Sequence, residues 1–477
     1  MSKDRTFTIQ LDEDLCKGSD CYICVNACPK GVFAEGERIT PKGLRPSQVK
    51  DPEECIGCDI CEFLCPELGI TVEEAGGTEQ VSTSTPKRGA TAPASGGWTT
   101  VQSSLDPGTH YMIGDEACAE GAIAAGCGFY AGYPITPASE IMVHMAKRLL
   151  QTDGVFIQME DEIGSIAAVI GASWAGSKSM TATAGPGFSL MMENIGYACM
   201  TETPCVVVDV QRAGPSTGQA SRPASGDVMQ AKWGTHGGVE IIALAPWSVQ
   251  EMHDLTIKAF NLAERFRVPV ILLADAITGH LRESFQVKET IELFDRIKVP
   301  GAPPFGSDDE SGVPPMPSFG EGEELLITGS THNRYGIRKT ADPDVHERLV
   351  KRLSKKITAH MEEITDYELY FEDGAQRVVV AYGSTARSAL WAVKVARERG
   401  ERVGMLRLKS LWPFPGELIR EWGRRCEEFI VPETNLGQIS QVVQQHTPNP
   451  VSLVSQTNGE IMDPRRVRDF LMGTNRH

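Results

Sequence analysis

Two cysteine runs near the N-terminus constrain the fold more than any other feature of the sequence. The first is CKGSDCYICVNACPKG (16–31) and the second is CIGCDICEFLCPE (55–67), and each contains a Cys-x₃-Cys-Pro segment. Eight of the 13 cysteines of the chain lie in these two runs. Thiolates spaced by two residues can turn from one loop toward the same cube of iron and sulfur, because sulfur is a soft, charge-donating ligand. The runs therefore predict two [4Fe–4S] clusters in a small N-terminal unit.

The spacing also predicts which cysteines share a cluster. In chains with two such runs, the fourth cysteine of each run ligates the other cluster. We therefore expect one cluster on Cys28, Cys55, Cys58 and Cys61, and the other on Cys16, Cys21, Cys24 and Cys65. The first run departs from the usual spacing, because the four residues KGSD separate its first two cysteines. Zinc or structural thiols are the alternative, but zinc sites take their four ligands in pairs and do not explain two Cys-Pro endings.

Composition limits the remaining function classes. A net charge of −17 argues against nucleic acid as a partner, since phosphate backbones require an excess of Lys and Arg. We expect no membrane span, because no stretch approaches the roughly 20 apolar residues that a membrane helix needs. The N-terminal sequence MSKDRTFTIQLDED is too polar for a signal peptide, which predicts a cytoplasmic protein with reduced thiols.

We predict five segments along the chain. Residues 1–73 form the cysteine-rich unit, and 74–108 form a flexible linker that is rich in Gly, Ser, Thr and Pro. Residues 109–298 alternate short β-branched runs with amphipathic helical patterns, which predicts a parallel sheet covered on both faces. A Pro/Gly-rich connection (299–340) leads to a second, smaller α/β domain (341–477).

Three polar segments follow predicted strands, where open parallel sheets bind their ligands. In GYPITPASE (132–140), Thr136 lies between two prolines that stiffen the backbone around its hydroxyl. The alternative is a helix start with Thr136 as N-cap and Pro137 as the first helical residue, and the residues alone favour this cap.

The other two segments carry charged side chains. In MEDEIGS (159–165), Glu162 opens a helix of small residues, whereas Glu160 and Asp161 fit the ordinary role of helix-dipole partners or caps. In VQRAGPSTG (210–218), Arg212 ends a strand, where its two-pronged donor set can grip a carboxylate. A surface salt bridge is the equally open alternative for this arginine.

Several long segments in the same order resemble a known family. They are GDEACAEGAIAAGCGFYAGYPITPASE, TATAGPGFSLMMENIGYA, VDVQRAGPSTGQ, VMQAKWGTHGG, LRLKSLWPFP and IVPETNLGQIS. Over residues 109–475 they resemble the α subunit of 2-oxoacid:ferredoxin oxidoreductases, most closely the 2-oxoglutarate members, and residues 9–70 resemble bacterial-type ferredoxins. The resemblance implies a thiamine-diphosphate-binding, pyrimidine-type, doubly wound parallel sheet and a transketolase C-terminal-like α/β domain. A small α+β ferredoxin domain with two [4Fe–4S] clusters would precede them.

The resemblance also implies a reaction. Thiamine diphosphate would be the cofactor, with Glu162 hydrogen-bonded to its pyrimidine ring, Arg212 on the carboxylate of the substrate and Thr136 beside the reacting keto acid. The implied reaction is the oxidative decarboxylation of 2-oxoglutarate with coenzyme A to succinyl-CoA and CO₂. Electrons would pass through the clusters to ferredoxin or another acceptor, or inward if the reaction runs toward carboxylation. The alternatives are the same chemistry on pyruvate, a branched-chain or an aryl 2-oxoacid, or a non-catalytic electron-transfer subunit.

Some expected parts are missing from the sequence. The Gly-Asp-Gly segment that holds the diphosphate through Mg²⁺ is absent, and GDEA (114–117) is a poor substitute. We therefore expect a β subunit that brings the diphosphate half of the site and another cluster, and a γ subunit that handles coenzyme A. Asp115 stands where the family pattern has Asn. Arg222, Lys232 and His236 are weak candidates for a second substrate carboxylate.

Overall fold

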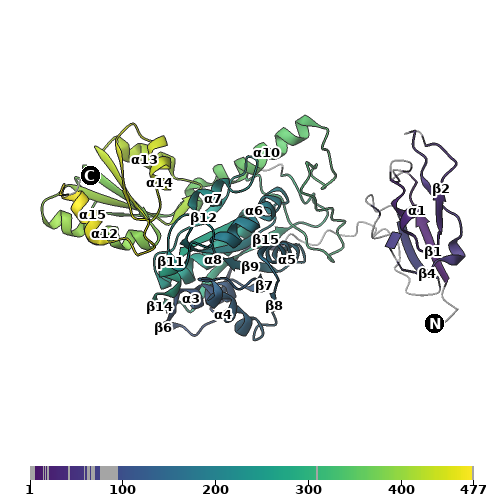
Figure 1. The fold of residues 1–477 in the computed structure, drawn as a ribbon, viewed down its shortest axis with the longest axis horizontal. Helices are drawn as coiled ribbons and strands as arrows, with labels where there is room; N and C mark the ends of the chain where they lie inside the picture. The colour runs from purple at the N-terminus through teal and green to yellow at the C-terminus, as the bar shows by residue number, and fades with distance from the viewer. Residues whose placement is uncertain are drawn as a thin grey trace. The chain divides into compact units, whose positions relative to one another are not determined.

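The computed structural model describes residues 6–13, 16, 18, 21–40, 43–58, 60–61, 65, 70–75, 95–307 and 310–474. The chain forms two compact units, Met1–Gly89 and Ala90–His477. Both are drawn in Figure 1, with the N-terminal unit in purple.

The first unit is a small α+β structure. Strand β1 (Thr6–Leu11) pairs antiparallel with β4 (Ile70–Ala75), and β2 (Phe33–Glu35) pairs antiparallel with β3 (Ser47–Val49). The short helix α1 (Ile23–Ala27) lies within the first cysteine run. Buried cysteines share the core with a few aliphatic and aromatic side chains, namely Cys24, Val32, Phe33, Cys61 and Ile70.

The second unit is built on a sheet of eight strands in the order β19-β12-β13-β10-β9-β7-β8, with β11 paired to β10 at the side. All strands from β12 to β8 in this order are parallel, as the sequence predicts. The strands are β7 (Cys127–Gly132), β8 (Val155–Gln158), β9 (Lys178–Thr183), β10 (Cys205–Ala213), β11 (Gln219–Pro223), β12 (Ile242–Leu244), β13 (Pro269–Asp275) and β19 (Ser410–Trp412). Every residue of β10 and β13 is buried, because these apolar strands have helices on both faces.

The helices follow the strands and make the sheet doubly wound. Helix α3 packs on both α4 and α8, and α5 packs on α6. They are α3 (Gly114–Ala124), α4 (Ser139–Leu149), α5 (Glu162–Trp174), α6 (Gly185–Met200), α7 (Val228–Trp233), α8 (Val249–Phe266) and α9 (Ala276–His280). Among the described residues, every helix is too short or too polar to cross a lipid bilayer.

Two antiparallel strand pairs pack against α8. Strand β5 (Ser95–Gln102) pairs with β15 (Thr290–Lys298), and β6 (Gly108–Ile113) pairs with β14 (Arg282–Val287). The end of the expected linker 74–108 is therefore a strand, since β5 gains hydrogen bonds from a segment that lies far away in sequence. Between β15 and the next helix, the described residues form turns and one isolated bridge, His332 to Arg338.

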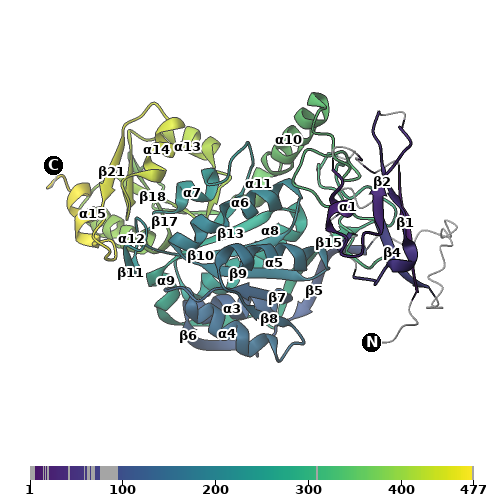
Figure 2. The same ribbon diagram turned by 45° about the vertical axis from the view of Figure 1, so that its right-hand side comes forward.

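The C-terminal part has its own sheet of five strands in the order β16-β18-β17-β20-β21. Its strands are β16 (Tyr367–Tyr370), β17 (Arg377–Tyr382), β18 (Val403–Leu408), β20 (Glu428–Glu433) and β21 (Val451–Ser455). Its helices are α10 (Pro343–Thr358), α11 (Met361–Ile364), α12 (Gly383–Glu398), α13 (Gly416–Gly423), α14 (Gln438–Gln445) and α15 (Pro464–Leu471). Helices α12 and α15 lie side by side in both views (Figures 1 and 2). The short strand β19 leaves this part and joins the large sheet antiparallel to β12.

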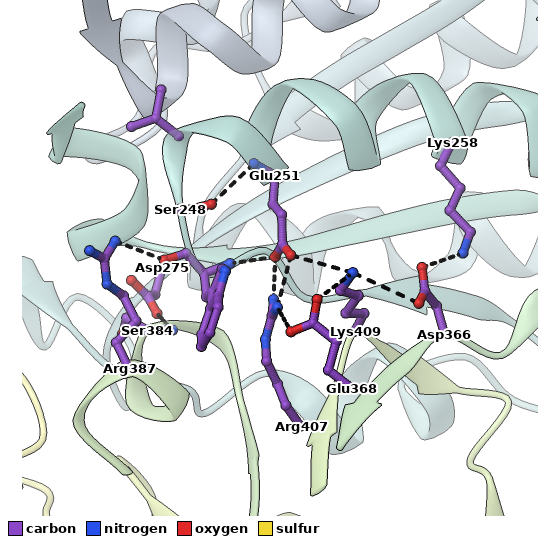
Figure 3. A network of polar contacts seen from close by, with 12 residues as sticks. Ser248, Glu251, Lys258, Asp275, Asp366, Glu368, Ser384, Arg387, Arg407 and Lys409 are labelled. Atoms are coloured by element: carbon purple, nitrogen blue, oxygen red, sulfur yellow. Dashed lines mark hydrogen bonds and ion pairs between the residues drawn. The ribbon is translucent and has the colours of Figure 1, made fainter. Parts of the chain in front are cut away.

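A buried ion-pair network connects the C-terminal sheet to α8 (Figure 3). The side chain of Arg407 on β18 is fully buried and lies 3.6 Å from the ring centre of Trp247. Its guanidinium donates to Glu251 of α8 and, over 2.9 Å, to Glu368 of β16. Lys409 lies 2.9 Å from Glu368 and completes the network. Ion pairs as well as the pairing of β19 with β12 therefore connect the C-terminal part to the central part.

Candidate active site

The first helix turn after β8 places Glu162 inside the protein. Asp161 is the N-cap of α5, and its side chain accepts a hydrogen bond of 2.7 Å from the backbone N–H of Gly164. This confirms the capping role expected of Asp161. The carboxylate of the next residue, Glu162, is not needed to cap the helix. Glu162 is buried, with 5% of its surface exposed.

A glycine makes room for the Glu162 carboxyl. A Cβ atom on Gly187, in the first turn of α6, would lie 2.3 Å from Oε1 of Glu162 and 2.2 Å from Oγ1 of Thr183. The Thr183 hydroxyl is buried and has no hydrogen-bond partner among the described residues. A buried carboxyl beside an unsatisfied hydroxyl and a side-chain-free backbone fits the pyrimidine half of thiamine diphosphate.

The structure brings Thr136 and Arg212 together. Nη1 of Arg212, near the end of β10, donates a hydrogen bond of 2.8 Å to the backbone carbonyl of Thr136, in the turn after β7. Arg212 is 8% exposed, and its Nε is buried without a hydrogen-bond partner in the described part of the chain. The surface salt bridge that was the alternative for this arginine is therefore wrong.

The capping role that the residues alone favour for Thr136 is also wrong. Helix α4 begins at Ser139 with Ala138 as its N-cap. The backbone N–H of Ala138 donates to the carbonyl of Ile135 over 2.9 Å, so the chain makes a tight turn before the helix starts. This turn keeps Thr136 outside the helix and exposed.

The start of α6 connects the three predicted residues. A Cβ atom on Gly187 would contact Glu162, as described above, and a Cβ atom on Gly185 would lie 3.9 Å from Cγ of Arg212. Glu162, Arg212 and Thr136 are therefore arranged around one edge of the parallel sheet, where β7, β8, β9 and β10 end. This is the edge at which such sheets bind their ligands.

A pair of acids beneath Arg212 is a feature that the sequence analysis missed. Asp209 lies on β10 and is fully buried, and its carboxyl interacts with that of Asp227 before α7. Burial raises the pKa of Asp209 well above its usual range, and the Asp227 carboxylate raises it further. Burial also raises the pKa of Asp227, against the lowering effects of its hydrogen bond with Asp209 and of the Arg212 charge. The only signal in the sequence is an acid inside the apolar run CVVVDV.

A cavity of about 690 Å³ opens beside Arg212. Its wall joins the central and C-terminal parts of the second unit and includes Gly185, Arg212, Asp227, Gln230, Thr434, Asn435 and Thr457. Among the described residues, Arg212 is the one cation in this wall, and the other polar groups are mainly hydroxyls and amides. Thr136 and Glu162 do not line this cavity.

The three weak candidates for binding a second substrate carboxylate each lie near an acidic side chain of the protein itself. Lys232 is buried and donates to Glu240 and, over 2.9 Å, to the carbonyl of Val239. Arg222 pairs with Glu460 over 2.9 Å on the surface. His236 is largely exposed and lies 3.5 Å from Glu193.

Four of the eight cysteines of the first unit converge. Cys28, Cys55, Cys58 and Cys61 line one cavity together with apolar side chains that include Ile9, Val32 and Phe33. These are the four cysteines that the spacing assigns to one cluster. Their convergence around one apolar cavity fits a metal–sulfur group.

Two cysteines of the other expected set, Cys16 and Cys24, lie near Ser47. The Ser47 hydroxyl lies 3.2 Å from Sγ of Cys24 and 3.9 Å from Sγ of Cys16, and its backbone N–H donates to Sγ of Cys16 over 3.3 Å. Of the KGSD insertion, only Gly18 is among the described residues, and its N–H also donates to Sγ of Cys16. Hydrogen bonds to sulfur are typical of cluster ligands. The five remaining cysteines (Cys118, Cys127, Cys199, Cys205 and Cys426) are buried in the second unit, as expected of packing residues.

Two family models match most of the second unit. The family model described as pyruvate flavodoxin/ferredoxin oxidoreductase, thiamine diP-bdg, matches residues 120–352, and pyruvate:ferredoxin oxidoreductase core domain II matches residues 375–467. The 2-oxoglutarate synthase subunit KorA of Methanocaldococcus jannaschii is 50% identical over 368 residues, which cover 76% of this chain and 99% of the relative. The ketoisovalerate oxidoreductase subunit VorB of Methanothermobacter marburgensis is 38% identical over 364 residues, which cover 75% of this chain and 96% of the relative.

A solved structure is similar as well. It is a 2-oxoglutarate:ferredoxin oxidoreductase from Magnetococcus marinus with 2-oxoglutarate, coenzyme A and succinyl-CoA bound, and it matches with a TM-score of 0.73 and 33% identity. The match covers 76% of this chain and 65% of that chain, so this chain spans about two thirds of its length. Fold, site and matches define a thiamine-diphosphate-binding oxidoreductase subunit. More specifically, the chain belongs to the family of 2-oxoacid:ferredoxin oxidoreductase α subunits.

Proposed function

We propose that this α subunit converts 2-oxoglutarate and coenzyme A to succinyl-CoA and CO₂. The two electrons released would leave through two [4Fe–4S] clusters in the N-terminal unit to ferredoxin. Four relatives named 2-oxoglutarate synthase subunit KorA are 45–50% identical to this chain, whereas two ketoisovalerate oxidoreductase subunits are 37–38% identical. This difference supports 2-oxoglutarate over a branched-chain substrate.

The observation that carries the proposal is the hydrogen bond from Arg212 to Thr136, next to the buried Glu162. Arg212 binds the carboxylate of the 2-oxoacid next to its keto group, and the fixed turn holds the Thr136 hydroxyl at that group. Glu162, whose carboxyl occupies the room that Gly187 leaves, would hydrogen-bond to the pyrimidine ring. When bound, thiamine diphosphate supplies the nucleophilic carbon at which 2-oxoacids are cleaved.

The N-terminal unit accounts for the electrons. Oxidative decarboxylation releases two electrons, and iron–sulfur clusters accept electrons singly. The four cysteines around one cavity (Cys28, Cys55, Cys58 and Cys61) hold one cluster. Cys16, Cys21, Cys24 and Cys65 hold the second, with Ser47 beside two of them.

Other subunits complete the enzyme. The sequence has no Gly-Asp-Gly segment, and the Asp115 side chain of GDEA is fully buried. A β subunit therefore provides the Mg²⁺ and diphosphate half of the site and a further cluster. A γ subunit assists with coenzyme A.

The test is the variant Glu162→Gln, purified with its partner subunits. Glutamine keeps the size of the side chain but removes the carboxyl group, so thiamine content and coenzyme-A-dependent dye reduction with 2-oxoglutarate should both fall, the latter about 100-fold or more. Glu398→Gln is the matched control, since Glu398 is exposed on α12, in the C-terminal part of the chain. Unchanged turnover in Glu162→Gln would show that the catalytic assignment of Glu162 is wrong. Faster turnover on pyruvate, branched-chain or aryl 2-oxoacids than on 2-oxoglutarate would overturn the substrate assignment.

A further inference from the structure

Four polar groups converge behind the turn that carries Thr136. They are the carboxylates of Asp115 in the first turn of α3 and of Glu140 in the first turn of α4, the imidazole of His280 at the end of α9, and the backbone carbonyl of Pro137. The ligand atoms of the three side chains lie within 4.8 Å of one another. They come from three helices that are far apart in sequence, so the fold itself assembles the group.

One nitrogen atom faces three oxygen atoms in this group. Nε2 of His280 lies 3.2 Å from the carbonyl oxygen of Pro137, 3.6 Å from Oε2 of Glu140 and 3.9 Å from Oδ2 of Asp115. A ring N–H can donate to one of these acceptors, and both carboxylates are beyond the length of a normal hydrogen bond. A proton on His280 therefore does not satisfy the group.

Asp115 is the least satisfied member of this group. Its side chain is fully buried, and neither carboxylate oxygen has a hydrogen-bond partner within the described part of the chain. Gly279 leaves room for the carboxylate, because a Cβ atom on this residue would lie 2.5 Å from Oδ1 of Asp115. A buried carboxylate needs a counter-charge or a proton. The asparagine of the family pattern would need neither, so the requirement arises from this chain's own residue.

We propose that Asp115, Glu140, His280 and the Pro137 carbonyl bind a divalent cation of the Mn²⁺ or Zn²⁺ class. A cation accepts lone pairs from all four groups at once, whereas a proton serves one or two of them. Imidazole combined with carboxylate and carbonyl oxygens suits these metals, and half-exposed Glu140 and His280 leave room for water to complete the coordination. The site is separate from the Mg²⁺ that accompanies the diphosphate of the cofactor. The ion fixes the Thr136–Pro137 turn to α3, α4 and α9.

The experiment uses the full chain with its clusters intact and without thiamine diphosphate, so that no Mg²⁺–diphosphate site is present. After treatment with a chelator, Mn²⁺ is titrated and its free concentration is followed by the electron paramagnetic resonance signal. The wild type should bind a single Mn²⁺ per chain, and Asp115→Asn and Glu140→Gln should each weaken binding about tenfold or more. Added Mn²⁺ should raise the Tm of the wild type but not that of Asp115→Asn. Asp153→Asn, a change of an exposed acid after α4, is the matched control and should bind like the wild type.

Two results would overturn the proposal. One is a wild-type chain that binds neither Mn²⁺ nor Zn²⁺ at millimolar concentration. The other is undiminished Mn²⁺ binding by both Asp115→Asn and Glu140→Gln. The Asp115→Asn variant also tests a simpler explanation, in which Asp115 is protonated and binds no metal. In that case the substitution would change neither the Mn²⁺ binding of the chain nor the effect of Mn²⁺ on its Tm. Because Glu140 is half exposed, Glu140→Gln keeps the test valid if Asp115→Asn folds poorly. None of these measurements needs substrate, cofactor or a second subunit, so their failure would not affect the proposed function.

Discussion

The guanidinium of Arg212 donates to the backbone carbonyl of Thr136 over 2.8 Å, although the two residues are 76 positions apart. The bond joins the end of β10 to the turn after β7 and orients the arginine before any ligand arrives. The Nε–H of Arg212 has no hydrogen-bond partner among the described residues. An oriented cation with an unused donor is preorganised for an anion.

We expect Arg212→Lys to weaken substrate binding more than turnover. Lysine keeps the charge, but it cannot hold the Thr136 carbonyl and grip a carboxylate with a planar pair of donors. The KM for 2-oxoglutarate should rise about tenfold or more, measured by steady-state kinetics of the assembled enzyme. Arg222→Lys is the matched control, because Arg222 makes an exposed pair with Glu460, and its KM should be unchanged. Equal KM values for both variants would remove Arg212 from the binding site.

Gly187→Ala should displace the Glu162 carboxyl. The added methyl group would lie 2.3 Å from Oε1 of Glu162, so the side chain or α6 must move. We expect thiamine content to fall and the free energy of unfolding to drop by about 1–3 kcal/mol, as in other overpacked cores. Denaturant unfolding of the full chain and cofactor analysis of the assembled enzyme measure the two effects.

A second glycine provides the control for this substitution. A Cβ atom on Gly171, in α5, meets no atom within 4 Å. Gly171→Ala should therefore stabilise the chain by about 0.5–1 kcal/mol, because alanine is the better helix former. A loss of stability in Gly171→Ala as large as that in Gly187→Ala would refute the steric explanation.

The acid pair of Asp209 and Asp227 predicts a pH dependence of stability. The pKa of Asp209 in the folded protein is raised, chiefly by burial, so folding favours its protonated form. The contribution is complete below the unfolded pKa of an aspartate, near 4, and is lost as the pH rises through the raised folded pKa. We expect the Tm of the wild type to fall as the pH rises above about 4, and the Tm of Asp209→Asn to fall less. Asp373→Asn, a change of an exposed acid, should follow the wild type, and identical slopes for all three would disprove the account.

Cys28→Ser should remove one cluster and leave the other. Cys28 comes from the first cysteine run, yet it lines the cavity of Cys55, Cys58 and Cys61 from the second run. We expect the iron content of the purified chain to fall to about half, as measured by colorimetric iron analysis and electron paramagnetic resonance. Cys426→Ser alters a buried cysteine of the C-terminal part and should keep all of the iron. Full iron content in Cys28→Ser would contradict the crossed assignment of ligands.

Arg407→Met should destabilise the junction between α8 and the C-terminal sheet. The substitution leaves Glu251 and Glu368 without their shared guanidinium in a largely buried setting. We expect a loss of about 3 kcal/mol in the free energy of unfolding, since breaking a buried ion pair leaves an uncompensated charge. Chemical denaturation measures it, and Arg420→Met, in an exposed pair with Glu417, should leave the midpoint unchanged. If the two variants had equal midpoints, the network of Figure 3 would contribute nothing to stability.

The parallel sheet was predictable because its signal is local. Runs such as VPVILLAD are apolar without alternation, and they become β13, buried on both faces. Asp161 was predictable as a cap for the same reason, since capping involves only the next few residues. Strand β5 was not, because SGGWTTVQ looks like a linker until β15 supplies its hydrogen bonds from nearly two hundred residues away.

The sequence provided candidate residues for the site but not the contacts between them. Motif resemblance proposes Glu162, Thr136 and Arg212 as site residues, yet nothing in the sequence predicts the hydrogen bond from the Arg212 guanidinium to the Thr136 carbonyl. Local rules favoured a cap at Thr136, and the turn closed by Ala138 and Ile135 overrides them. The weak candidate Lys232 is buried and paired with Glu240, eight residues further along the chain.

Strand β19 has a consequence for how such an architecture can be divided between genes. Two of its residues, Ser410 and Trp412, pair with β12. A chain break between the central and C-terminal parts would therefore leave β12 as an unpaired edge strand, which is prone to aggregation. Fission of the polypeptide at that boundary would thus carry a folding penalty. Separation near residue 90, at the boundary in sequence between the two compact units, would cut no β-ladder among the described residues.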